Sequence, residues 1–184
     1  MPLERQKRVL RYRQNSDRKM CIIAYLILMY GLKKEHGIEK PPGFIYNEHG
    51  KPYLAEHPHI FFNISHCKAG VVCVLSEDEV GIDMQEIRPF DIDVAKRVCQ
   101  EYELEDILRC NSPERYFCKL WTIKESFVKL HGGSAIPFSS FDARSLSEQL
   151  SPTAVYHWGK EYHICCFGMV GEGKICKIEP HQLF

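Results

Sequence analysis

The sequence predicts one compact α+β unit of 184 residues. Apolar residues recur at helical spacing between Pro113 and Gly132, which is typical of a long helix with one buried face. Short apolar runs at 60–65, 71–75 and 80–84 are typical of strands. The chain contains no internal repeat, low-complexity tract or linker-like segment, so these elements are expected to share a single core.

The first predicted element is a buried helix near the N-terminus. Residues 20–30, MCIIAYLILMY, form the longest apolar run, and its 11 residues are too few to span a bilayer. Asp17 is the predicted N-cap of a helix over about residues 18–33. A loop containing proline and glycine at 41–43 and a turn within 46–54 follow this helix.

The middle of the chain is predicted to form strands. The first two cover 60–65 and 71–75. The acidic segment 76–79 is a turn into a third strand at 80–84, which indicates a hairpin between the second and third strands.

The C-terminal part is predicted to contain two helices followed by short strands. One helix covers about 92–108. The second begins at Ser112-Pro113, because proline is favoured in a first helical turn, and ends at Gly132-Gly133. Strands are predicted at 154–158 and 161–167.

Composition and charge narrow the class of protein. The chain is 45% hydrophobic and 26% charged with zero net charge, as in ordinary globular proteins. Residues 1–40 carry ten Lys/Arg against four Asp/Glu, whereas residues 77–106 carry eleven Asp/Glu against three Lys/Arg. The first segment can bind a polyanion and the second a cation, although both patterns also occur on solvated surfaces. A nucleic-acid-binding protein lacks support, because there is no recognition motif and the acidic segment opposes it.

Cysteine usage indicates a reducing compartment. Nine cysteines are an odd number, and no C-x-x-C spacing occurs, so neither a disulfide framework nor a cysteine metal site is predicted. The N-terminus is charged from Glu4 onward, unlike a secretory leader. We therefore expect a cytoplasmic protein without a membrane segment.

The helix after Pro113 places a charge where a core residue is expected. Its apolar arc comprises Tyr116, Phe117, Leu120, Trp121, Phe127 and Val128. Lys124 projects from the middle of this arc, where its charge needs a partner or must extend to the surface. Glu125 and Lys129 lie one turn apart at the edge of the arc, as an ordinary surface ion pair or as part of a site.

Other candidate residues lie on the strands and turns. Asp83 and Gln85 share a strand face, where they are two oxygen ligands for a hard cation such as Mg²⁺ or solvated neighbours of a turn. Ser65 and His66 cannot easily act as nucleophile and base, because adjacent strand residues point to opposite faces. His66 is also compatible with a structural role, and Lys51 with a polar turn.

Four segments together carry a resemblance to a known family. They are HGKPY (49–53), FNISHC (62–67), VGIDMQ (80–85) and WTIKESFVK (121–129). In this order and separation they resemble the phosphopantetheinyl transferases of the surfactin-synthetase type. The resemblance extends from the basic segment at 11–18 to about Gly133.

The resemblance implies a fold and a reaction. The fold is a single unit of two similar α+β halves, about 1–79 and 80–184, related by a pseudo-twofold with coenzyme A in the cleft between them. A monomer is implied, because the cleft forms within one chain. The reaction transfers the 4′-phosphopantetheine arm of coenzyme A to a serine of an apo-carrier protein and releases 3′,5′-ADP. The carrier is of fatty-acid, polyketide or nonribosomal-peptide type.

The resemblance also implies roles for particular residues. Coenzyme A contacts are expected from Arg13, Lys51, Ser65, His66, Lys124 and Lys129. Asp83 and Glu125 are expected to bind Mg²⁺, and Glu125 is also the candidate base for the carrier serine. Lys129 is the second catalytic candidate, which neutralises phosphate charge or protonates the leaving oxygen.

Gln85 departs from the family pattern, which has an acidic residue at this position. The Gln85 amide oxygen can coordinate a cation but brings no charge, so it is the weakest of the three predicted metal ligands. This departure motivates an alternative function, a catalytically weak module that binds coenzyme A or a nucleotide.

Overall fold

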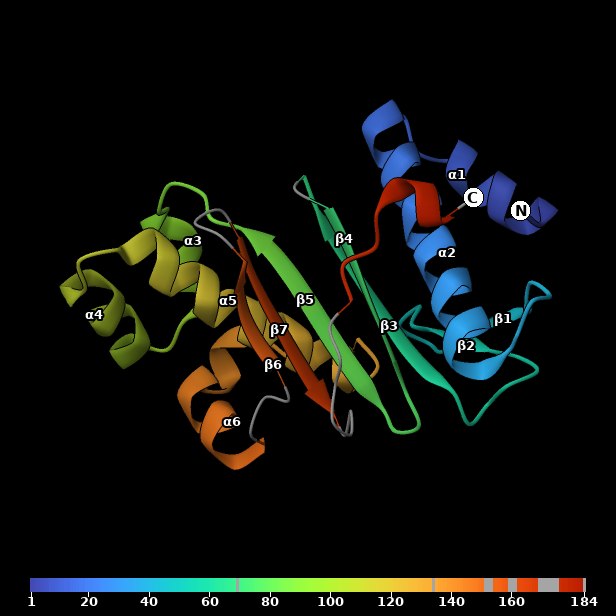
Figure 1. Ribbon diagram of the computed structural model, residues 1–184. Coiled ribbons are helices and arrows are strands. Elements are labelled where there is room, and N and C mark those ends of the chain that lie inside the picture. The colour runs from blue at the N-terminus through green and yellow to red at the C-terminus, as the bar shows by residue number, and fades with distance from the viewer. Residues whose placement is uncertain (69, 134, 151–153, 159–161, 169–175, 184) are drawn as a thin grey trace.

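The computed structural model describes residues 1–68, 70–133, 135–150, 154–158, 162–168 and 176–183 (Figure 1). The helices are α1 (Leu3–Leu10), α2 (Asn15–His36), α3 (Ile92–Val98), α4 (Glu101–Arg109), α5 (Pro113–Leu130) and α6 (Ala143–Leu150). The strands are β1 (Phe44–Tyr46), β2 (Pro52–Leu54), β3 (Phe61–Cys67), β4 (Gly70–Ser76), β5 (Val80–Glu86), β6 (Ala154–Trp158) and β7 (Tyr162–Gly168). Short 3₁₀ turns cover Phe138–Ser140 and Pro180–Leu183. The mixed α and β content agrees with the predicted class.

Helix α2 covers the antiparallel pair β3–β4 (Figure 1). Leu28 and Leu32 are fully buried against Phe62 of β3 and apolar residues nearby, as the apolar run predicted. The helix begins at Asn15 with Gln14 as its N-cap, so the prediction that Asp17 caps it is wrong. Asp17 lies in the first turn instead, where its negative charge interacts favourably with the helix dipole.

Helix α5 covers the antiparallel sheet β5–β7–β6 (Figure 1). It begins at Pro113, and Gly132 and Gly133 follow it with positive φ angles of 79° and 77°, as predicted. Gly81 of β5 allows this close packing, because a Cβ there would lie 2.1 Å from the Ser126 carbonyl oxygen. The close approach brings the side chains of β5 next to those of α5.

Strands β3 and β5 meet at a seam where, among the described residues, no hydrogen bond joins one backbone to the other. The Asn63 side chain accepts from the Ile82 amide at 3.0 Å, and the Ser65 hydroxyl accepts from the Met84 amide at 3.1 Å. Each step of two residues on β3 matches a step of two on β5, so these strands run in the same direction. The predicted hairpin between β4 and β5 is wrong, because the two strands belong to different sheets.

The partners of β4 and β5 are different strands. Strand β4 pairs with β3, and β5 pairs with β7 through the register Asp83↔Cys165 and Gln85↔His163. After the turn that follows β4, strand β5 therefore pairs along its whole length with β7 instead of with β4.

The helix predicted over about 92–108 is two helices. Asp91 caps α3 by accepting from the amides of Asp93 and Val94. The backbone is extended at Cys99 and Gln100, where α4 begins with a capping box. Glu103 accepts from the Gln100 amide at 2.8 Å, so the second helix has its own start within the predicted span.

Two sequence predictions concern the whole chain. All nine cysteines are free, as their odd number and spacing predicted. Among the described residues, no helix is both long and apolar enough to cross a membrane.

Candidate active site

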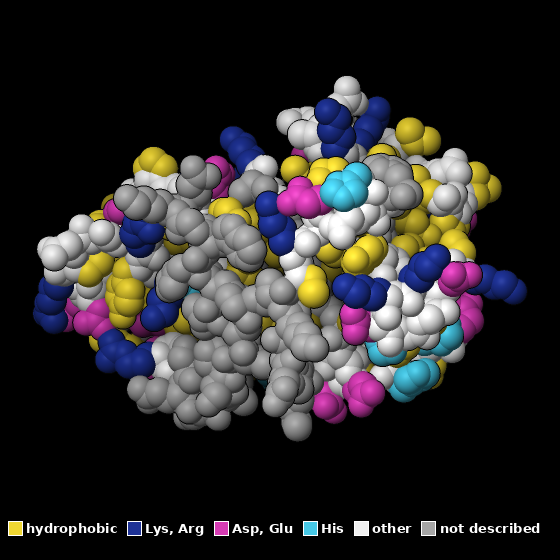
Figure 2. Space-filling model, in the orientation of Figure 1, with side chains coloured by type: hydrophobic (Ala, Val, Ile, Leu, Met, Phe, Trp, Pro, Cys, Tyr) yellow, Lys and Arg dark blue, Asp and Glu magenta, His cyan; other side chains and the backbone are white. Residues whose placement is uncertain are grey.

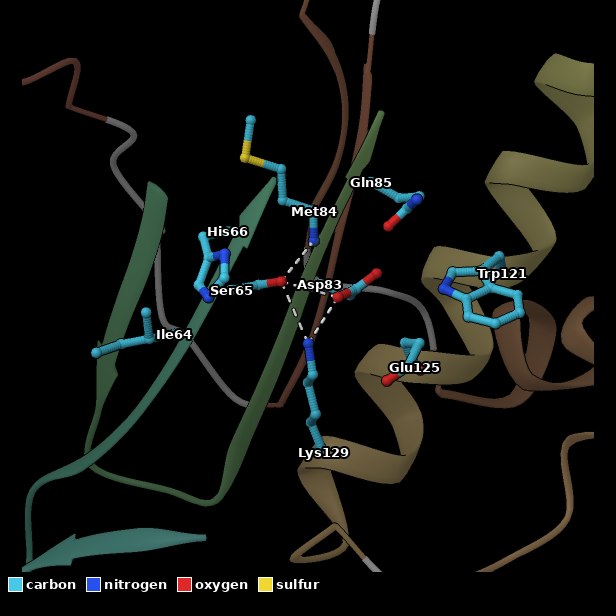
Figure 3. Close-up of a pocket in the computed structure, with 9 residues that line it drawn as sticks. All are labelled: Ile64, Ser65, His66, Asp83, Met84, Gln85, Trp121, Glu125 and Lys129. Atoms are coloured by element: carbon cyan, nitrogen blue, oxygen red, sulfur yellow. Dashed lines mark hydrogen bonds and ion pairs between the residues drawn. The ribbon is translucent and has the colours of Figure 1, made fainter. Parts of the chain in front are cut away.

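A pocket of about 290 Å³ lies between β3, β5 and α5 (Figure 3). Its lining residues come from three of the four segments that carried the family resemblance, and they are Ile64, Ser65, His66, Asp83, Met84, Gln85, Trp121, Glu125 and Lys129. The structure therefore brings together most of the residues that were singled out in the sequence.

The β5 strand directs Asp83 and Gln85 into this pocket. Alternation along the strand places both side chains on the face toward α5 (Figure 3). Asp83 is only 5% exposed, whereas Gln85 is half-buried. The prediction that the two residues share one face is confirmed.

The two oxygens of Asp83 have different surroundings. Oδ1 accepts from the Ser65 hydroxyl at 2.8 Å and from the Lys129 ammonium at 2.6 Å. Oδ2 is buried and has no hydrogen-bond partner. Figure 3 shows this second oxygen turned to the space between β5 and α5, which Gln85 and Glu125 also face. One oxygen is thus fixed by the protein and the other is available.

Helix α5 contributes three pocket residues at intervals of four, Trp121, Glu125 and Lys129. This spacing places them one above another on one side of the helix. The α5 side of the pocket is therefore formed by the edge of the apolar arc predicted for this helix. Trp121 was counted only as a core residue, although its spacing from Glu125 and Lys129 could have placed it here. Its ring packs edge-on against Phe117 and Phe138, which fixes its position.

Glu125 lies in an environment that disfavours its charge. Burial raises the pKa of its carboxyl group above the ordinary value; the Lys129 ammonium opposes this rise, and the Asp83 carboxylate adds to it. A carboxylate with a raised pKa is a better proton acceptor at neutral pH than an exposed one. The geometry therefore suits Glu125 to bind a cation or to accept a proton.

Lys124 does not lie in the pocket. Its side chain is fully buried, and its ammonium donates to Glu103 at 2.5 Å and to the carbonyl oxygens of Val98, Phe138 and Phe141, each at 3.0 Å. An ammonium has three hydrogens, so these acceptors use all of them. In this structure Lys124 therefore has no hydrogen left for a contact with coenzyme A, contrary to the prediction. Its buried carboxylate partner is Glu103, which the sequence reading did not single out.

Lys51 also lies outside the pocket lining. Its side chain is 6% exposed, and its ammonium donates to Glu79 at 2.5 Å and to the carbonyl oxygens of Val80 and Leu130 at 3.3 and 3.2 Å. In this structure it joins the β2 segment to the start of β5 and the end of α5. These three acceptors match the three hydrogens of the ammonium, and the phosphate contact of Lys51 stays a prediction.

The remaining predicted contacts are His66 and Arg13. His66 is exposed and lines the pocket. Arg13 lies in the exposed link between α1 and α2, outside the pocket lining. Lys and Arg side chains gather near the beginning of α2 in the space-filling view (Figure 2). The structure thus brings His66 to the other site residues but leaves Arg13 apart from them.

The donor set of the pocket fits a hard divalent cation. The buried Oδ2 of Asp83 lacks a donor, which is costly unless a cation or a water satisfies it. Glu125 and the Gln85 amide can supply two further oxygens. No group of three or more His, Cys, Asp or Glu side chains suited to a metal occurs in the described part of the chain. Two carboxylates with water suffice for Mg²⁺, which dehydrates reluctantly.

This combination defines a class of site. Carboxylates that can bind a divalent cation, with a lysine beside them, are typical of sites that act on phosphate esters. Residues 79–173 match the profile of the 4′-phosphopantetheinyl transferase superfamily. The chain belongs to this superfamily.

Curated relatives support the same family over most of the chain. A 4′-phosphopantetheinyl transferase of Bacillus subtilis is 33% identical over 147 residues, which are 77% of this chain and 65% of the relative. The transferase gsp of Aneurinibacillus migulanus is 34% identical over 86% of this chain and 66% of its own length. The transferase psf-1 of Bacillus pumilus is 40% identical over 65% of this chain and 50% of its length. The chain thus spans about two thirds or less of the length of these relatives.

Proposed function

We propose that this protein transfers the 4′-phosphopantetheine arm of coenzyme A to a serine of an apo-carrier protein, with release of 3′,5′-ADP. The observation that carries the proposal is the convergence of Asp83, Glu125 and Lys129 in one pocket. These residues lie within the segments that match the superfamily. The names of the relatives describe the same type of transfer.

The proposed step forms one bond and breaks another. The carrier serine oxygen bonds to the phosphorus that bears the pantetheine arm, and the bond from this phosphorus to the oxygen of the ADP leaving group breaks. Glu125 accepts the serine proton, directly or through a water, for which its raised pKa is suited. Lys129 neutralises the charge that develops on the leaving phosphate.

Asp83, Glu125 and, more weakly, Gln85 would bind the divalent cation, which we propose to be Mg²⁺. When bound, it supplies charge stabilisation to the pyrophosphate of coenzyme A. The unpartnered oxygen of Asp83 supports this assignment. His66, exposed at the opposite side of the pocket, is the proposed partner for a phosphate of coenzyme A.

We propose that the chain forms one unit of two similar halves, residues 1–79 and 80–184, related by a pseudo-twofold. Each proposed half has one long helix over antiparallel strands: α2 covers β3–β4, and α5 covers β5–β7. The pocket lies between the two sheets. Because the proposed cleft forms between two halves of one chain, we propose a monomer. Nine free thiols support a cytoplasmic location.

Mass spectrometry of carrier modification tests the proposed activity. The protein is incubated with coenzyme A, Mg²⁺ and a panel of apo-carriers of the fatty-acid, polyketide and nonribosomal-peptide types. We expect at least one carrier to gain the mass of the phosphopantetheine arm, together with one equivalent of 3′,5′-ADP. Absence of this mass from every carrier would contradict the proposed transfer.

A catalytically weak module that binds coenzyme A is the second candidate function. Gln85 favours it, because an uncharged ligand stands where a third carboxylate would strengthen metal binding. Isothermal titration of coenzyme A with and without Mg²⁺ separates the candidates when it is set beside the carrier assay. Binding of coenzyme A without transfer to any carrier would favour the module.

A further inference from the structure

Ser65 connects the seam between the sheets to the predicted metal ligand. Its side chain is 6% exposed, and its hydroxyl makes three hydrogen bonds. It accepts from the Met84 amide at 3.1 Å and from the Lys129 ammonium at 3.2 Å, and it donates to Asp83 Oδ1 at 2.8 Å (Figure 3). A hydroxyl has one hydrogen and two lone pairs, so these three bonds use its full capacity.

This arrangement leaves the Ser65 hydroxyl without a hydrogen for a phosphate oxygen. Its single hydrogen is directed to Asp83, because the Met84 amide and the Lys129 ammonium can only donate. A direct hydroxyl contact to coenzyme A, as the family resemblance implied for Ser65, would require this bond to break. The geometry favours a role that acts through Asp83.

We propose that Ser65 is a positioning residue that fixes Oδ1 of Asp83 and thereby presents Oδ2 to the divalent cation. The inference rests on the proposed function, since it concerns the cation of that site. The Met84 amide fixes Ser65 itself, so the orientation of Asp83 is tied to the backbone of its own strand. Partners that orient a metal ligand in this way commonly contribute 10- to 100-fold to metal affinity.

Asn63 provides a matched comparison on the same strand. It lies two residues before Ser65, is also buried, and accepts from the Ile82 amide of β5 at 3.0 Å. It therefore makes the same kind of link across the seam, but it has no hydrogen bond to Asp83 among those of the described residues. Loss of Asn63 removes a seam bond and leaves the support of Asp83 intact.

The test compares coenzyme A binding with and without Mg²⁺ in the variants Ser65→Ala and Asn63→Ala. In wild-type protein we expect Mg²⁺ to tighten coenzyme A binding. Ser65→Ala should shift the Mg²⁺ dependence to roughly tenfold higher concentration or more. Its affinity for coenzyme A in EDTA should remain within about twofold of wild type. Asn63→Ala should keep the wild-type Mg²⁺ dependence, although both variants lose one seam bond. Mn²⁺ binding followed by electron paramagnetic resonance gives a second readout that needs no carrier.

Two outcomes would overturn the positioning role. An unchanged Mg²⁺ dependence in folded Ser65→Ala would show that Asp83 needs no support from the hydroxyl. An equal loss of coenzyme A affinity with and without Mg²⁺ would show a direct contact to coenzyme A. If Ser65→Ala fails to fold, Ser65→Thr replaces it. Retention of Mg²⁺ dependence by Ser65→Thr and its loss in Ser65→Cys support the role, whereas equal behaviour of these two variants overturns it. Because these readouts measure binding, they stay informative even if no carrier is modified.

Discussion

At the residue scale, the variant Glu125→Gln distinguishes two roles of Glu125, half of a surface ion pair or a catalytic group. If Glu125 only paired with Lys129, Glu125→Gln would cost less than about 1 kcal/mol and leave transfer nearly intact. As the proposed base and cation ligand, the same change should reduce carrier modification by roughly 10²-fold or more, while folding and much of the coenzyme A affinity remain. Initial rates by mass spectrometry and circular dichroism of the variant measure both effects. Normal transfer by a folded variant would refute the mechanism.

The raised pKa of Glu125 also predicts how stability depends on pH. Its ionised form is less favourable in the folded protein, so its contribution is present below the ordinary pKa of 4.5 and is lost as the pH rises through the folded value. In EDTA, Glu125→Gln should therefore melt at a higher temperature than wild type at pH 7. The difference should shrink toward pH 4, as followed by thermal unfolding across this range. A constant difference would contradict the assigned burial.

Gln85 should limit the strength of cation binding. A carboxylate at this position adds a charge beside the cation, so Gln85→Glu should lower the half-maximal Mg²⁺ concentration by roughly tenfold, or about 1.4 kcal/mol. Titration of Mg²⁺ in the coenzyme A binding assay measures this shift. Glu86 is the control, because it is next on β5 and outside the pocket lining. Glu86→Gln should leave the titration unchanged, and an unchanged titration in Gln85→Glu would place Gln85 away from the cation.

At the element scale, Lys124 fixes α5 to the elements around it. Removing one partner of a buried ion pair costs about 3–5 kcal/mol, so Lys124→Met should lower the free energy of unfolding by this amount. Adding Glu103→Gln should recover part of the loss, because the unpaired charge disappears while the acceptor remains. Arg109→Met, which breaks the exposed pair with Glu105, should cost less than about 1 kcal/mol. Denaturant titration distinguishes these cases. A stable Lys124→Met protein with impaired coenzyme A binding would restore Lys124 as a ligand contact.

The elements themselves could be predicted where the signal is local. Helix α5 was recognised from its apolar spacing and from Pro113 and Gly132, all of which lie within or beside it. The shared face of Asp83 and Gln85 followed from strand alternation alone. These local patterns placed the residues on their elements, whereas the family resemblance implied that they form one site.

Pairing between distant segments could not be predicted in the same way. Strand β5 pairs with β7, about eighty residues later in the chain, and no local pattern indicates that partner. The family resemblance implied that Lys124 and Lys51 contact coenzyme A, but their observed acceptors, Glu103 and Glu79 with several carbonyl oxygens, come from other elements. A buried lysine in a sequence therefore indicates that a partner exists, but the fold decides which one.

At the scale of the whole molecule, burial should make most thiols unreactive. It raises the pKa to about 11 for Cys99 and Cys165 and to about 12 for three others, Cys73, Cys118 and Cys166. At pH 7.5 these five should resist iodoacetamide in the native protein, because the thiolate is the reactive form. The exposed Cys176 should react first. Peptide mapping measures the order, with full labelling in guanidinium as the control. Early labelling of Cys118 would contradict its burial on α5.

The seam between β3 and β5 joins two sheets through side chains instead of through a backbone ladder. Across this seam the Ile82 and Met84 amides donate to the side chains of Asn63 and Ser65 instead of to backbone carbonyl oxygens. Ser65 is one of these two side chains, and its hydroxyl also donates to Asp83. The same hydroxyl thus joins the contact between the two sheets to the position of the Asp83 carboxylate in the pocket.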